Sequence, residues 1–140
     1  MSRLRTLHVA LRVHDIDRSL GFYAALGYTI LGHVGPDADM RLYFLKCPDD
    51  PFVTLELVSR PADGPVQIGT GFHHLVVQVD SLGTTVTRLT QSGLRPEPLQ
   101  YPGGPEGPKT AWLTDPDGYR IELVEWPAGH ADGLTETDVP

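Results

Sequence analysis

Residues 72–79, FHHLVVQV, restart a pattern that the chain first shows at residues 4–13, LRTLHVALRV. In both stretches apolar residues alternate with other residues, which is typical of a β-strand with one buried face. The later copy follows the earlier one at an offset of 66 residues (74 − 8), which three pairs share: His8 and His74, Gly27 and Gly93, and Glu56 and Glu122. Apolar matches arise easily by chance, but glycines and His/Glu pairs in one register indicate an internal duplication.

Each copy is predicted to contain a strand, a helix and three more strands, in the order βαβββ. In the first copy, Asp15 is a suitable N-cap for a helix over residues 16–26, which Gly27 would end. In the second copy, Ser81 is the corresponding N-cap. Alternation and turn residues predict strands at these ranges: 4–13, 28–34, 40–47, 52–59, 72–79, 109–114 and 119–126. The Pro- and Gly-rich stretch 96–108 is predicted to be a loop around at most a short strand.

These ranges predict a single α+β domain over residues 1–140. Its two modules are expected at residues 4–60 and 70–126, followed by a flexible tail at residues 127–140. One helix covers only one face of each sheet. The modules must therefore pair through their other faces, either within one chain or across two.

Composition and charge exclude several classes of function. The net charge of −7 and the scattered Lys and Arg residues argue against nucleic-acid binding, which needs clustered cations. No apolar run approaches the roughly 20 residues that cross a bilayer, and the N-terminus lacks the apolar core of a secretory signal. A cytoplasmic location is therefore expected. Cys47 is the only cysteine, which excludes a disulfide framework, and it is expected to be an inert small residue.

Four residues carry the expected chemistry: His8, Glu56, His74 and Glu122. In both modules the glutamate follows the histidine by 48 residues (56 − 8 and 122 − 74). Strand alternation places these side chains on the face opposite the apolar residues that pack against the helix. A carboxylate inside a concave sheet is costly unless it is paired, hydrogen-bonded or bound to a metal. Two imidazoles and two carboxylates suit one divalent ion such as Ni, Co, Zn, Mn or Fe.

Two arginines are candidate substrate-binding residues. Arg12 and Arg60 have the same parity as the two predicted ligands of the first module, so both are expected to favour a substrate that carries carboxylates. A solvated arginine at the edge of the sheet remains the alternative for Arg12. His73, by contrast, is expected to point to the face opposite His74, because neighbouring side chains alternate along a strand.

The motifs resemble the vicinal oxygen chelate superfamily, and most closely glyoxalase I, the lactoylglutathione lyase. The resemblance covers residues 4–126 and rests on four segments: LHVALRVHDIDRSLGFYAALGY at 7–28, TLELV at 54–58, HHLVVQV at 73–79 and DPDGYRIELVEW at 115–126. The pattern in the first segment is shared across the superfamily. Glutamate at position 56, together with His8, His74 and Glu122, is more selective and matches the glyoxalase I metal set residue by residue.

The resemblance implies a glyoxalase/bleomycin resistance/dioxygenase-like fold, with βαβββ modules paired across a homodimer. Each metal site would combine His8 and Glu56 of one chain with His74 and Glu122 of the other. The bound ion would be Ni, Co or Zn, with Ni or Zn favoured for a short bacterial-type chain.

The implied reaction is isomerisation of the hemithioacetal of methylglyoxal and glutathione to S-lactoylglutathione. Glu122, or Glu56 for the opposite stereochemistry, would move the proton. Arg12 matches the arginine that family members use on a glutathione carboxylate. Arg60 stands where the family often has asparagine, so another thiol or another carbonyl substrate stays open.

Two alternatives remain. An epimerase of the methylmalonyl-CoA type shares the enolate chemistry and an HHLVVQV-like segment, but it usually has glutamine among its ligands and lacks the DPDGYRIEL ending. A binding protein of the bleomycin-resistance kind would use a similar dimeric cavity without metal. Metal content after extensive dialysis distinguishes the enzymes from the binding protein.

Overall fold

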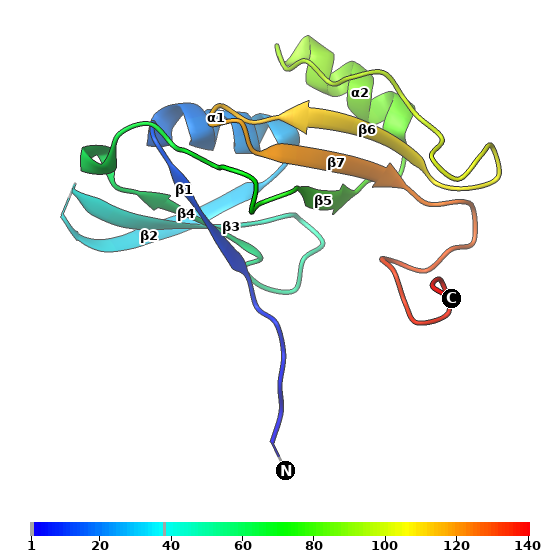
Figure 1. Ribbon diagram of the computed structural model, residues 1–140, viewed down its shortest axis with the longest axis horizontal. Helices are drawn as coiled ribbons and strands as arrows, with labels where there is room; N and C mark the ends of the chain where they lie inside the picture. Colours follow the sequence, from blue (N-terminus) through cyan, green and yellow to red (C-terminus); the bar gives the residue numbers. More distant parts are fainter. Residues whose placement is uncertain (1, 38) are drawn as a thin grey trace. The chain divides into compact units, whose positions relative to one another are not determined.

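The computed structural model describes residues 2–37 and 39–140. The chain forms two units, Met1–Ile68 and Gly69–Pro140, and each contains one α-helix and one sheet (Figure 1). This division agrees with the predicted α+β duplication. Among the described residues, no helix is both long enough and apolar enough to cross a membrane.

The first unit has the order βαβββ followed by a short 3-10 helix. Its elements are β1 (Val9–Val13), α1 (Ile16–Leu26), β2 (Thr29–Asp37), β3 (Met40–Lys46), β4 (Leu55–Ser59) and η1 (Pro61–Asp63). The strand order in the sheet is β1-β4-β3-β2, with β1 and β4 parallel and the other pairs antiparallel. The first and last strands of the module are therefore neighbours, which brings their side chains together.

The second unit repeats this arrangement with a smaller sheet. Its elements are β5 (Leu75–Gln78), α2 (Leu82–Gln91), β6 (Lys109–Thr114) and β7 (Arg120–Glu125), and the strand order is β5-β7-β6. The second strand of the predicted βαβββ pattern, which would follow α2, is reduced to an isolated bridge between Gln100 and Thr110. Five prolines lie between positions 96 and 108, and proline lacks the N–H that a strand ladder needs. The expectation of at most a short strand in this loop is confirmed.

The helix ends follow the predicted capping residues. The Asp15 carboxylate accepts a hydrogen bond from the Arg18 amide at 3.2 Å, and the Ser81 hydroxyl accepts one from the Thr84 amide at 3.4 Å. Gly27 ends α1 with a φ of 129°, in a region that side chains rarely adopt. Both predicted N-caps are confirmed.

The two sheets share one register, so the duplication extends to the pairing of individual residues. In the first unit Ala10 lies opposite Glu56, and in the second Val76 lies opposite Glu122. The residues on either side of each glutamate are completely buried: Leu55, Leu57, Ile121 and Leu123. Because side chains alternate along a strand, both carboxylates point away from the buried side of their sheets, as predicted.

The predicted first strands start too early in both units. Residues 4–8 are not in a strand, and Leu4 and Leu7 are exposed. The strand β1 pairs only with β4, which begins at Leu55, the partner of Val9. Residues before Val9 therefore have no strand to pair with, and His8 lies just outside the sheet. The same holds for His74, which immediately precedes β5.

Candidate metal site

His8 and Glu56 are in contact in the first unit. The His8 Nε2 atom lies 3.1 Å from the Glu56 Oε1 atom, and their side chains are 30% and 14% exposed. The contact forms because His8 lies two residues before Ala10, the strand partner of Glu56. Phe44, which faces Glu56 from β3, packs its ring against the His8 ring in an edge-to-face arrangement, with centroids 6.3 Å apart. The aromatic ring thus limits the positions that the imidazole can take.

The second unit places equivalent residues in an equivalent way. His74 lies two residues before Val76, the strand partner of Glu122. Trp112 faces Glu122 from β6, and its ring packs edge-to-face against the His74 ring, with centroids 5.0 Å apart. Each predicted His/Glu pair therefore has an aromatic ring beside it. The correspondence of Phe44 and Trp112 was not visible in the sequence, because they are separated by 68 positions (112 − 44) and the repeat offset is 66.

His74 differs from His8 in its immediate partner. No hydrogen bond or ion pair joins His74 to Glu122 in the described part of the chain, and its Nδ1 atom lies 2.7 Å from the Nδ1 atom of His73. The prediction that His73 points to the opposite face was wrong in this respect. His73 lies outside β5 and has no strand partner, so strand alternation does not fix where its side chain points. His73 is therefore positioned to orient the His74 ring.

The paired side chains have donor chemistry and spacing that fit a divalent ion. Two ligands that each lie about 2.1 Å from one ion, at right angles, are roughly 3 Å apart. The His8–Glu56 separation of 3.1 Å matches this spacing. No group of three or more potential metal ligands occurs within residues 2–37 and 39–140. Each unit by itself contains two of the four predicted ligands.

Both candidate substrate arginines have partners. Arg12 donates from Nη1 to the Gly64 carbonyl at 2.9 Å and from Nη2 to the Pro65 carbonyl at 3.1 Å. Both of these partners are uncharged carbonyl oxygens. Arg60 follows β4 directly, and its Nε atom lies 3.5 Å from Asp63 Oδ1, which offsets part of its charge.

A charged pair that the sequence analysis missed holds Trp112 in the second unit. Arg120 lies over the Trp112 ring, with its Cζ atom 5.0 Å from the ring centroid. Arg120 also forms an ion pair with Glu97, and its hydrogen bond lowers the pKa of the Glu97 carboxyl. Glu97 lies in the loop that the sequence indicated only as Pro- and Gly-rich. The ion pair with Glu97 holds Arg120 in place, and Arg120 in turn covers one face of the Trp112 ring.

Cys47 is chemically quiet, as expected. Burial and the nearby Asp50 carboxylate raise the pKa of its thiol to about 11. The reactive thiolate is therefore scarce near neutral pH. Cys47 makes a poor nucleophile or metal ligand.

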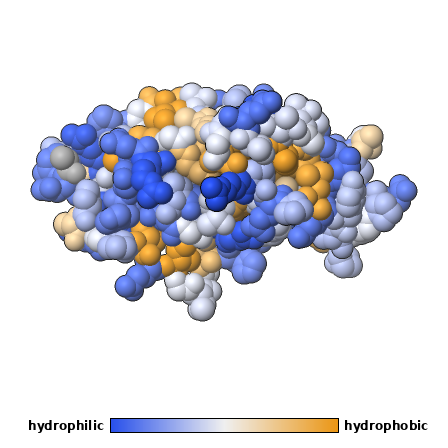
Figure 2. Space-filling model, turned by 90° about the horizontal axis from the view of Figure 1, so that it is seen from above, coloured by the Kyte–Doolittle hydropathy of each residue, from blue (hydrophilic) through white to orange (hydrophobic). Residues whose placement is uncertain are grey.

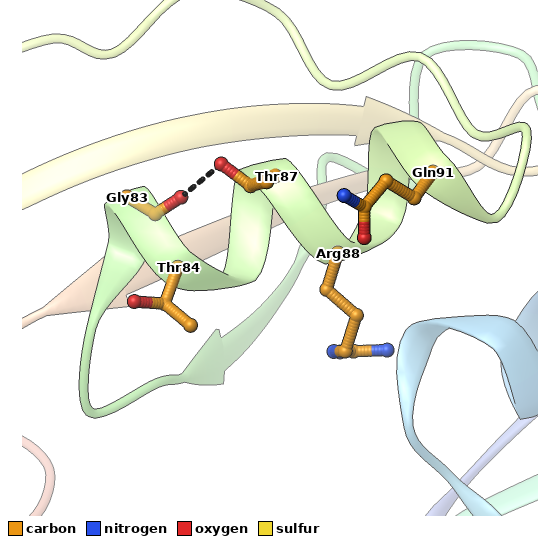
Figure 3. Close-up of a pocket in the computed structure, with 5 residues that line it drawn as sticks. All are labelled: Gly83, Thr84, Thr87, Arg88 and Gln91. Carbon is orange, nitrogen blue, oxygen red and sulfur yellow. Dashed lines mark hydrogen bonds between the residues drawn. The ribbon is translucent and has the colours of Figure 1, made fainter.

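An open depression along α2 is unrelated to the predicted ligands. It is lined by Gly83, Thr84, Thr87, Arg88 and Gln91 (Figure 3). The Thr87 hydroxyl donates back to the Gly83 carbonyl of its own helix at 3.0 Å, so it is already satisfied. On the side of the molecule seen in Figure 2, hydrophilic surface separates several small hydrophobic groups. We therefore assign no site to this depression.

Comparison with known proteins gives one consistent family. The model of the Glyoxalase/Bleomycin resistance protein/Dioxygenase superfamily matches residues 5–123. The lactoylglutathione lyase of Escherichia coli O157:H7 is 32% identical over 128 residues, covering 87% of this chain and 93% of that protein. A probable chloroplastic lactoylglutathione lyase of Arabidopsis thaliana is 36% identical and covers 86% of this chain, which spans only 35% of that longer protein. The solved trypanothione-dependent glyoxalase I of Leishmania major has a TM-score of 0.70 and 28% identity, covering 88% of this chain and 87% of that one.

Proposed function

Because this chain belongs to the glyoxalase/bleomycin resistance protein/dioxygenase superfamily, we propose that it is a metal-dependent, glyoxalase I-like lyase. It would convert the hemithioacetal of a 2-oxoaldehyde and a thiol into an S-2-hydroxyacylthiol. The observation that carries this proposal is the duplicated His/Glu arrangement, with a direct 3.1 Å contact between His8 and Glu56. The equivalent register of Glu122 and the identities of the lyase relatives support it further.

The proposed ion is held by His8, Glu56, His74 and Glu122. Two neutral imidazole nitrogens and two carboxylates favour Ni, Co or Zn over a hard ion such as Mg, which prefers oxygen ligands only. When bound, the ion would stabilise the negative charge that develops on the substrate oxygens. We further propose that the chain is a homodimer in which each site takes one His/Glu pair from each subunit.

The proposed role of the glutamates is proton transfer between neighbouring carbons. Glu122 would take the proton from the carbon beside the carbonyl and return it to the next carbon. Glu56 would do so for the opposite stereochemistry. The aromatic rings of Phe44 and Trp112 lie beside the glutamates and would limit exchange of that proton with water.

The thiol partner is proposed from charge. Arg12 and Arg60 are two cationic side chains of the first unit, so a thiol that bears carboxylates is favoured. Glutathione is such a thiol. Arg12 also holds two backbone carbonyls, so its reach toward a substrate is restricted.

We expect S-lactoylthiol formation when the metal-free chain is reloaded and assayed with methylglyoxal. The assay compares Ni, Co and Zn, each with glutathione and with trypanothione, because relatives named for both thiols match this chain. Activity should depend on the added ion and be lost on chelation. A chain that forms no thioester with any ion or thiol would contradict the proposed reaction. A chain that stays free of metal but binds a drug tightly would favour the sequestering alternative.

A further inference from the structure

The C-terminal segment of the second unit folds back on its own sheet. In Figure 1 this segment, in red, turns back beyond the end of β7 on the side away from α2. Gln78, the last residue of β5, donates from Nε2 to Asp132 Oδ1 at 2.7 Å. Its Oε1 atom accepts from the Gly133 amide at 2.9 Å and from Trp126 Nε1 at 2.7 Å. All the polar atoms of one side chain thus serve to hold the segment.

Gln78 lies on the same sheet face as Glu122. Val76 is the strand partner of Glu122, and Gln78 is two residues further along β5, opposite Val124. Side chains two residues apart on a strand share a face and are separated by roughly 7 Å. The segment that Gln78 holds therefore meets this face of the sheet at the Gln78/Val124 pair, two residues along the strands from Glu122.

The first unit uses the equivalent position in the same way. Arg12 corresponds to Gln78 in the repeat (12 + 66 = 78). It donates to the carbonyls of Gly64 and Pro65, which follow the last strand of its module. In both units, a side chain from the first strand thus fastens the chain that leaves the last strand. This recurrence supports a built-in role for the Gln78 contacts.

A histidine closes the segment on itself. The His130 Nε2 atom lies 2.7 Å from Asp138 Oδ1, and its Nδ1 atom lies 2.5 Å from the Ala131 carbonyl oxygen. The His130 ring stacks on the Trp126 ring, with centroids 4.5 Å apart and planes 12° apart. A neutral imidazole has only one N–H, so only the protonated ring can donate to both acceptors.

We propose that residues 127–138 form a strap over the Glu122 face of the second sheet, anchored by Gln78, closed by protonated His130 and opened when His130 loses its proton. The groups around His130 favour its protonated form. The Ala131 carbonyl and the Asp138 carboxylate raise the pKa of His130, while Trp126, directly after β7, and Gln78, in β5, are neutral. Asp132 on the same strap is already held by Gln78. The Thr135 amide and His130 lower the pKa of Asp138, which stays charged.

The sign of the pH effect follows from linkage. A group whose pKa is raised by folding stabilises the folded form below its unfolded pKa, and this stabilisation is lost as the pH rises through the folded pKa. The strap should therefore be closed in mildly acidic solution and looser in alkaline solution. Access of a bulky thiol to Glu122 would change as the strap opens and closes. That consequence rests on the proposed function, whereas the closure of the strap does not.

Amide hydrogen exchange of the full-length chain tests the closure without any substrate. Protection of residues 128–138, corrected for intrinsic exchange, should be about three- to tenfold greater near pH 5.5 than near pH 9, on either side of the ordinary histidine pKa. The amides of Gly133 and Thr135, which donate to Gln78 and Asp138, should report it most directly. Replacement of His130 by glutamine should remove the pH dependence, and Gln78→Ala should lower protection at both pH values.

The matched control is His33→Gln, which changes an exposed histidine of the first unit that packs on Tyr43. It should keep the wild-type pH dependence of the strap. Equal protection of the wild-type strap at both pH values would overturn the proposal, as would a His130→Gln chain that retains the dependence. Because exchange is measured without turnover, a chain with no lyase activity can still support the strap.

Discussion

Replacing Glu122 with glutamine is expected to reduce kcat by about 10² to 10⁴, the usual contribution of a positioned general base. Glutamine has nearly the same shape, but it cannot accept the carbon-bound proton. The fold should survive, because Ile121 and Leu123 supply the buried side chains of β7 while residue 122 points away from them. Steady-state kinetics on the metal-loaded variant measures the effect, and thermal unfolding confirms that the chain is intact.

The matched control is Glu106→Gln, which changes an exposed carboxylate in the loop between α2 and β6. This variant should keep the wild-type kcat. The fall in kcat of Glu122→Gln would then not be a general effect of removing one negative charge from the chain. Glu56→Gln, on the equivalent strand of the first unit, separates the roles of the two carboxylates. If the Glu122→Gln enzyme turns over at the wild-type rate, Glu122 is not the base.

Mixing two inactive variants should restore about a quarter of the wild-type activity if each site is shared between two chains. His8→Ala and His74→Ala each remove one proposed ligand from a different unit. In a mixed dimer of these variants, one site lacks both histidines and the other is intact. Half of the dimers formed by random exchange are mixed, and each has one of its two sites restored.

The measurement is thioester formation after the two variants are unfolded together, refolded and loaded with metal. The control mixes His8→Ala with Glu56→Gln, whose changes fall in the same half-site, so no intact site can form. Activity no greater than that of the separate variants in the first mixture would exclude sites shared between chains. Recovery in both mixtures would point to incomplete inactivation instead.

Features set by local chemistry were predictable from the sequence. The α1 helix spans the predicted residues 16–26, because Asp15 caps its start and Gly27 adopts a positive φ at its end. The β6 strand spans the predicted 109–114. The side of the sheet to which each glutamate points was predictable too. Its neighbours on the strand are buried leucine or isoleucine residues, and alternation then directs the glutamate to the opposite side.

Features that depend on long-range pairing were not predictable. The start of β1 is set by where β4 begins, which the sequence of residues 4–8 does not encode. His73 lies just before a strand, where alternation gives no orientation, and so its contact with His74 was missed. Arg12 donates to a carbonyl and Gln78 donates to a carboxylate that each lie more than 50 residues away, in segments without a periodic pattern.

The most direct measurement of the central claim is a calorimetric titration of the metal-free chain with Ni or Co. We expect one ion per chain, and we expect His8→Ala and His74→Ala each to weaken binding by about 100-fold or more, since loss of an outer-shell partner alone costs 10- to 100-fold. His33→Gln should bind as the wild type does. If either ligand variant, His8→Ala or His74→Ala, kept wild-type affinity and stoichiometry, the four side chains would not share one ion, and the account would be contradicted.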